Sequence, residues 1–100
     1  MQYHKLVRDN IPKKIESNGE KAAYHIATDA EYWLKLKEKL LEEVSEFNQA
    51  ENAEELADIF EVIEAIVEYK KFDPNIIAQL KADKAEKNGK FKNKIILDEA

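Results

Sequence analysis

The chain has 100 residues, no cysteine and a formal net charge of −5 at pH 7. This negative charge argues against binding a nucleic-acid duplex across a broad surface. A chain of this length predicts one domain over residues 1–100, with a core so thin that a homo-oligomer is expected. The missing cysteines exclude a disulfide framework and a thiolate metal site, and no apolar run is long enough for a membrane span or a signal peptide, so the cytoplasm is the expected location.

The chain contains only two glycines and two prolines, with 44% apolar and 37% charged residues, which is typical of a mainly helical protein. A short helix is predicted first, because Asn10 can cap it, Pro12 suits its first turn and Gly19 can end it. Residues 21–27 then form a short segment that is only weakly strand-like.

Two long amphipathic helices are predicted next. Thr28 and Glu31 have the spacing of a capping box, which starts a helix that runs to about Asn48, and Asn52 with Glu55 repeats that spacing for the second helix. Apolar residues recur at steps of three and four in both: Trp33, Leu36, Leu40, Val44 and Phe47, then Leu56, Ile59, Phe60, Ile63, Ile66 and Val67. Because the connecting loop is short, the two helices should fold back as an antiparallel hairpin.

The remaining chain predicts one more helix and a short tail. Asp73 and Pro74 start this helix, which should pack through Ile76, Ile77 and Leu80 and stop near Gly89. Residues 95–97 are a short strand candidate for pairing with residues 22–26. We therefore expect an all-α fold in which the hairpin and the other helices form a bundle, with short terminal β pairing, assembled as a homodimer or homotetramer.

Acidic residues are crowded at the predicted hairpin loop. The last turn of the first long helix should lie beside the first turn of the second, so that Glu43 and Glu46 face Glu55 and Asp58. On a helical wheel Glu43 lies at the edge of the apolar stripe, whereas Glu42 lies nearly opposite it. A set of oxygen ligands without cysteine or nearby histidine suits Mg²⁺ or Mn²⁺ better than zinc.

Two other readings of these acids stay open at this point. Surface glutamates are common on helices, so the cluster can be a solvated acidic patch, with Glu55 serving only in helix capping. A ferritin-like di-iron site would require Glu-x-x-His pairs, and the histidines are His4 and His25, far from the acids in sequence. Against the solvated patch, Glu46 lies in the last turn of its helix, where the helix dipole disfavours an anion.

The acids also match a family signature. The runs EEVSE (42–46) and ELAD (55–58) resemble the EExxE…ExxD pattern of the all-α nucleoside triphosphate pyrophosphohydrolases, the MazG-like and phosphoribosyl-ATP pyrophosphohydrolase-like group. The opening YHKLVRDNIP is similar to that of small MazG-like members, and the closing KAEKNGKFKNKIIL resembles their closing segment. Together these segments cover most of the chain in the order found in that group.

The resemblance implies hydrolysis of a nucleoside triphosphate between the α and β phosphates, giving a monophosphate and pyrophosphate, with house-cleaning of non-standard nucleotides as the role. It implies that Mg²⁺, with Mn²⁺ as a substitute, is held by Glu43, Glu46, Glu55 and Asp58 and activates a bound water. Glu42 would be an outer-shell carboxylate of the same catalytic set. The candidates for binding phosphate are basic: Lys5, Arg8, Lys84, Lys87, Lys90 and Lys92. The alternatives are a phosphoribosyl-ATP pyrophosphohydrolase and a non-catalytic helical interaction module.

Overall fold

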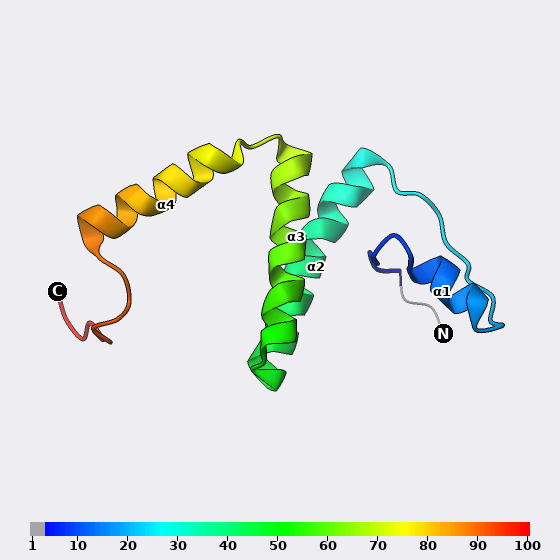
Figure 1. Ribbon diagram of the computed structural model, residues 1–100, viewed down its shortest axis with the longest axis horizontal. Helices are drawn as coiled ribbons and strands as arrows, with labels where there is room; N and C mark the ends of the chain where they lie inside the picture. The colour runs from blue at the N-terminus through cyan, green and yellow to red at the C-terminus, as the bar shows by residue number, and fades with distance from the viewer. Residues whose placement is uncertain (1–3) are drawn as a thin grey trace.

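The computed structural model describes residues 4–100, which form four helices and no strand (Figure 1). The helices are α1 (Ile11–Ser17), α2 (Asp29–Ala50), α3 (Ala53–Lys70) and α4 (Pro74–Asn88). The predicted all-α class is therefore confirmed, while residues 1–3 of the predicted domain lie outside the described range. Within that range no helix combines the length and the apolar character needed to cross a bilayer.

Side-chain caps fix the starts of the three longer helices where the sequence predicts them. Each cap accepts a hydrogen bond from a nearby backbone N–H group: Glu31 donates to Thr28 at 3.3 Å, Glu55 to Asn52 at 3.0 Å and Asn75 to Asp73 at 2.9 Å. Such caps satisfy backbone donors that have no partner inside the helix. Asn10 is the N-cap residue of α1, as predicted, but its side chain makes no such bond, and its backbone carbonyl accepts one from Lys14.

Helices α2 and α3 form the predicted antiparallel hairpin (Figure 1), and theirs is the main helix–helix contact within residues 4–100. The turn is tight because Glu51 adopts a left-handed conformation, with φ of 50°, and its N–H donates to the Phe47 carbonyl at 2.8 Å. This is the geometry that commonly ends a helix, although glycine is the usual residue there. The last turn of α2 is thereby held beside the first turn of α3.

The core between the two helices is small. Three residues are buried within residues 4–100: Leu36, which is 1% exposed, Val62, which is 8% exposed, and the acid Glu43. Helix α3 turns the flank that carries Val62 toward α2, so part of the predicted apolar stripe faces away from the hairpin. Three residues of that stripe are exposed: Leu56, Phe60 and Ile63.

Helices α1 and α4 do not complete a bundle within one chain. Helix α4 projects from the end of α3, and α1 lies on the opposite side of the hairpin (Figure 1). The predicted packing of α4 is wrong for a single chain, because Ile76, Ile77 and Leu80 are exposed. The predicted pairing of residues 95–97 with 22–26 is also wrong, since the projecting α4 carries the tail to the other end of the molecule (Figure 1).

The chain is more open than a compact monomer of its size. Its radius of gyration is 17.9 Å, whereas a compact chain of this length has one of about 13 Å. Its accessible surface is 9400 Å², whereas a compact monomer of its mass exposes roughly 5,800 Å². Much of the apolar surface of α2, α3 and α4 is therefore left uncovered by the chain itself.

Candidate metal centre

The hairpin brings acids from α2 and α3 together at its closed end. Glu43, Glu55 and Asp58 each offer one carboxylate oxygen, and these oxygens lie within 4.8 Å of one another. Glu42, Glu43 and Glu46 form a second group under the same limit. Glu43 belongs to both groups, so the five acids form one connected set, hereafter the acidic cluster, with Glu43 at its centre.

Glu43 is the acid that a solvated patch does not explain. Glu43 is only 6% exposed, and its Oε2 atom is buried without a hydrogen-bond partner. Oε2 of Glu55 is also buried without a partner. Buried polar atoms in folded proteins are nearly always paired, and a buried charge without a partner is especially unfavourable. Two such oxygens on facing helices, joined by Asp58, fit a hard divalent cation that takes only oxygen ligands.

The electrostatics of Glu43 agree with this reading. Burial raises the pKa of Glu43, the charge of Glu46 raises it further and that of Asp58 adds to the effect, against the opposing charge of Lys39. The ionised form of Glu43 is therefore disfavoured in the metal-free protein. A proton or a cation at this carboxylate relieves that cost.

Glu42 lies closer to the other acids than the helical wheel predicts. Its carboxylate belongs to the group with Glu43 and Glu46 instead of pointing to the opposite side. The wheel describes the direction of Cβ, whereas a flexible glutamate can carry its carboxylate along the helix surface. Burial acts to raise the pKa of Glu42, but the hydrogen bond from Lys5 and the charges of Lys39 and Lys5 outweigh it, so that this pKa is lowered.

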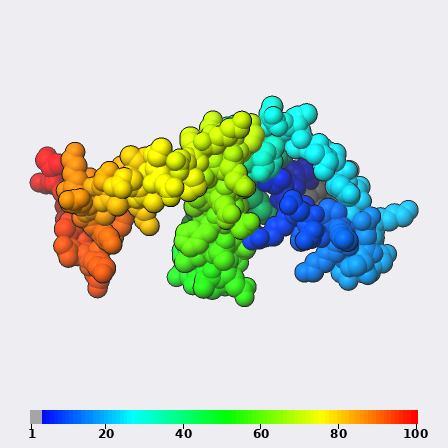
Figure 2. Space-filling model, turned by 45° about the horizontal axis from the view of Figure 1, so that its top comes forward, coloured from blue at the N-terminus to red at the C-terminus, as the bar shows by residue number. Residues whose placement is uncertain are grey.

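The N-terminal segment brings two of the predicted basic residues onto the acidic cluster. Nη2 of Arg8 lies 2.9 Å from Oδ1 of Asp58, and Nζ of Lys5 lies 3.0 Å from Oε1 of Glu42. Figure 2 shows this segment, in dark blue, lying against the hairpin. Both pairs join residues that are far apart in sequence, so no local spacing could have identified them.

Lys39 is a third basic residue at the acidic cluster, and it is not among the residues predicted from the sequence. Its Nζ lies 3.5 Å from Glu42 and 3.4 Å from Glu43. The signal was present in the sequence, since residues three and four positions apart share one face of a helix. Lys39 therefore pairs with Oε1 of Glu43 and leaves Oε2 without a partner.

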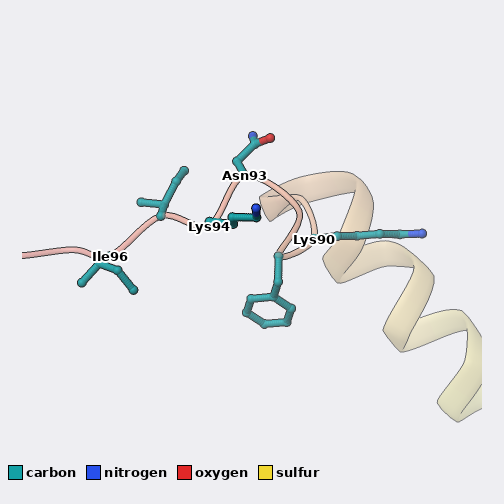
Figure 3. A pocket seen from close by; sticks show the side chains of 6 residues that line it. Lys90, Asn93, Lys94 and Ile96 are labelled. Carbon is teal, nitrogen blue, oxygen red and sulfur yellow. The ribbon is translucent and has the colours of Figure 1, made fainter.

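The remaining predicted phosphate-binding lysines do not reach the acids of the same chain. Lys84 and Lys87 lie on the projecting α4, and Lys90 and Lys92 follow it in the tail (Figure 1). All four are exposed. In Figure 3, Lys90 and Asn93 point in different directions around the bend of the tail, so these side chains do not converge on a common ligand.

Three aromatic residues, Tyr32, Trp33 and Tyr69, contact one another at the open end of the hairpin. Trp33 of α2 stacks on Tyr69 of α3, with ring centroids 5.3 Å apart and an interplanar angle of 6°. Nζ of Lys70 and of Lys37 lie 4.9 Å and 5.2 Å from the Trp33 ring centroid. The contacts of Trp33 with Tyr69 and Lys70 join α2 to α3, which is the packing role that the position of Trp33 on its stripe predicts.

Comparison with known proteins gives one local match. Over 46 residues the chain is 44% identical to an uncharacterized protein of Mycolicibacterium smegmatis (strain ATCC 700084 / mc(2)155), and the match covers 46% of this chain and 47% of that relative. The matched region is thus about half the length of the relative. No protein-family model and no solved structure matches the chain.

Proposed function

We propose that this chain is a metal-dependent nucleoside triphosphate pyrophosphohydrolase of the MazG-like group, which releases a nucleoside monophosphate and pyrophosphate. The observation that carries the proposal is the buried Glu43, whose unpartnered Oε2 lies in a cluster with Glu55 and Asp58. A surface patch explains the exposed Glu46, but it does not explain the buried Oε2 of Glu43, because Lys39 pairs only with Oε1 of that carboxylate. The family resemblance of the acidic runs then supplies the reaction.

In this proposal each residue of the cluster has a role. Glu43, Glu46, Glu55 and Asp58 hold Mg²⁺ or Mn²⁺, and Glu42 serves as an outer carboxylate whose charge is balanced by Lys5 and Lys39. The cation, when bound, supplies charge that neutralises phosphate oxygens and favours ionisation of water. The side chains orient the cation and the phosphates, and no protein nucleophile is required.

The proposal includes a homo-oligomer. The chain exposes far more surface than a compact monomer, and this surface includes Phe60 and Ile63 on α3. The excess is of the size that obligate subunit interfaces bury, about 2,000 Å² or more in total. A second copy also offers Lys87 and Lys90 an acidic cluster to reach, because the projecting α4 holds them away from their own.

The test is Mg²⁺-dependent hydrolysis by two isosteric variants, Glu46→Gln and Asp58→Asn. Each keeps the size of the side chain but removes a charge that a hard cation requires, so activity should fall by at least about 100-fold while circular dichroism shows an unchanged helix content. Glu64→Gln is the matched control, because this exposed acid on α3 lies outside the cluster. Full activity in Asp58→Asn would refute the placement of the metal.

A further inference from the structure

The carboxylate oxygens of the acidic cluster differ in what neutralises them. Oδ1 of Asp58 is paired with Arg8 at 2.9 Å, whereas Oε2 of Glu43 and Oε2 of Glu55 have no partner. Asp58 also belongs to the group of three acids that offers a cation its ligands. Asp58 is therefore a member of the candidate ligand group that a basic side chain of the N-terminal segment already pairs.

We infer that Arg8 competes with the divalent metal for Asp58 and transfers to a nucleotide phosphate when substrate binds. This inference rests on the proposed function. A guanidinium group 2.9 Å from Asp58 repels a second cation at the same carboxylate and occupies one of its oxygens. The planar donor fork of arginine matches phosphate as well as it matches carboxylate, so a bound nucleotide offers Arg8 an equivalent partner.

The surroundings of Arg8 permit this exchange. The Arg8 side chain is 58% exposed and that of Asp58 is 40% exposed, and ion pairs in such positions are weak. The segment that carries Arg8 precedes α1 and has no regular secondary structure, so its movement breaks no helix. The exchange makes the binding of metal and nucleotide cooperative, and each raises the affinity for the other by the same factor.

The first experiment measures binding of Mn²⁺ alone, by calorimetry or electron paramagnetic resonance, without nucleotide. Arg8→Ala should bind Mn²⁺ about three- to tenfold more tightly than the wild type, because one repelling charge beside a ligand is removed. Arg8→Lys keeps that charge and should stay within about twofold of the wild type. Lys14→Ala is a second control, because it removes one positive charge from α1, and Lys14 belongs to none of the ion pairs found within residues 4–100. Its affinity for Mn²⁺ should also differ little from that of the wild type.

A double-mutant cycle then tests whether the effect passes through Asp58. In an Asp58→Asn background, Arg8→Ala should tighten Mn²⁺ binding by much less than in the wild type, because Arg8 has lost its carboxylate partner. With a non-hydrolysable nucleoside triphosphate analogue present, the gain in Mn²⁺ affinity should be larger in the wild type than in Arg8→Ala. Should Arg8→Ala fail to fold, Arg8→Gln carries the same test.

The outcomes separate this inference from the proposed metal site. If Mn²⁺ binding depends on Glu43 but Arg8→Ala leaves it unchanged or weaker, the competition is refuted and the metal site stands. If Glu43→Gln binds Mn²⁺ as tightly as the wild type, the metal site itself is refuted. A tighter Arg8→Ala, together with loss of the effect in Asp58→Asn, supports the exchange.

Discussion

At the scale of single residues, Glu43 is the acid of the cluster whose ionisation burial opposes most clearly. Its carboxylate is buried between two helices, and its pKa is raised first by that burial and then by the neighbouring Glu46. A raised pKa means that the folded protein holds the proton of Glu43 more tightly than the unfolded chain does. The contribution of Glu43 to the free energy of unfolding is therefore fully present below pH 4.5, the ordinary pKa of a glutamate. It is lost as the pH rises through the raised pKa of the folded protein.

Glu43→Gln should consequently stabilise the metal-free protein at neutral pH, by roughly 1 kcal/mol, because it keeps the shape of the side chain but removes a buried charge that Lys39 pairs only at Oε1. The gap in melting temperature between variant and wild type should widen as pH rises above 4.5. Mg²⁺ should raise the melting temperature of the wild type but not of the variant. Thermal unfolding across this pH range checks all three expectations.

The control for this measurement is Glu64→Gln, an exposed acid outside the acidic cluster. Its metal-free stability should match that of the wild type, and its stabilisation by Mg²⁺ should be intact. A metal-free Glu43→Gln protein that is less stable than the wild type at pH 7 would contradict the account given for this residue.

At the scale of the helices, α3 presents two different surfaces. One flank carries Glu55, Asp58 and Val62 toward α2, and the adjoining stripe leaves Phe60 66% exposed. Burying a phenylalanine side chain contributes about 1.5–3 kcal/mol, which a single chain does not gain here. The exposed stripe is the surface that a second copy is proposed to cover.

Phe60→Ser tests that role for α3. If Phe60 lies in an interface between copies, the substitution should lower both the measured mass and the melting temperature, because an interface contact is lost. If Phe60 lies on a free surface, the stability of the protein should change by no more than about 0.5 kcal/mol. Light scattering should give the wild type at least twice the chain mass of 11.6 kDa. Ile26→Ser is the control, because Ile26 is 87% exposed in the segment before α2. A wild type that remains monomeric would remove this interface.

Local patterns predicted the helices well, and they predicted less about how the helices are arranged. The caps at Thr28, Asn52 and Asp73 were readable because each acts on a backbone group a few residues away. The pairing of Arg8 with Asp58 could not be predicted from local patterns, because it depends on the path of the whole N-terminal segment. The stripe on α3 was found correctly as a pattern, but a pattern does not say whether the chain itself or another copy covers it.

The acids show the same division. Hairpin geometry brings Glu43, Glu55 and Asp58 together, as the helix spacing suggested, whereas Glu46, which was also predicted to face the acids of α3, groups with Glu42 and Glu43 of its own helix. The direction assigned to Glu42 was wrong, because a wheel gives the direction of Cβ and not the position of a flexible carboxylate. The depth at which Glu43 is buried depends on the packing of α2 against α3, which periodicity alone does not determine.

At the scale of the whole molecule, the projecting α4 separates the C-terminal lysines from the acids of the same chain (Figure 1). If lysines and acids of different copies form each site, two inactive variants should complement one another. The test mixes two chains, one carrying Lys87→Ala with Lys90→Ala and the other carrying Asp58→Asn, and refolds them together. For a dimer, half of the refolded dimers contain one chain of each kind, and each of these has one intact site of two. The mixture should therefore recover about a quarter of wild-type activity. Activity no greater than the sum of the separate variants would place the lysines outside the site.

The central claim is that the acidic cluster supports cleavage between the α and β phosphates of a nucleotide. The most direct measurement is incubation of the purified protein with Mg²⁺ and a panel of nucleoside triphosphates, followed by chromatographic and phosphorus NMR identification of the products. We predict nucleoside monophosphate and pyrophosphate in equal amounts from at least one substrate, with the reaction abolished by chelation of the metal. Release of nucleoside diphosphate and orthophosphate, or no hydrolysis across the panel, would contradict this account.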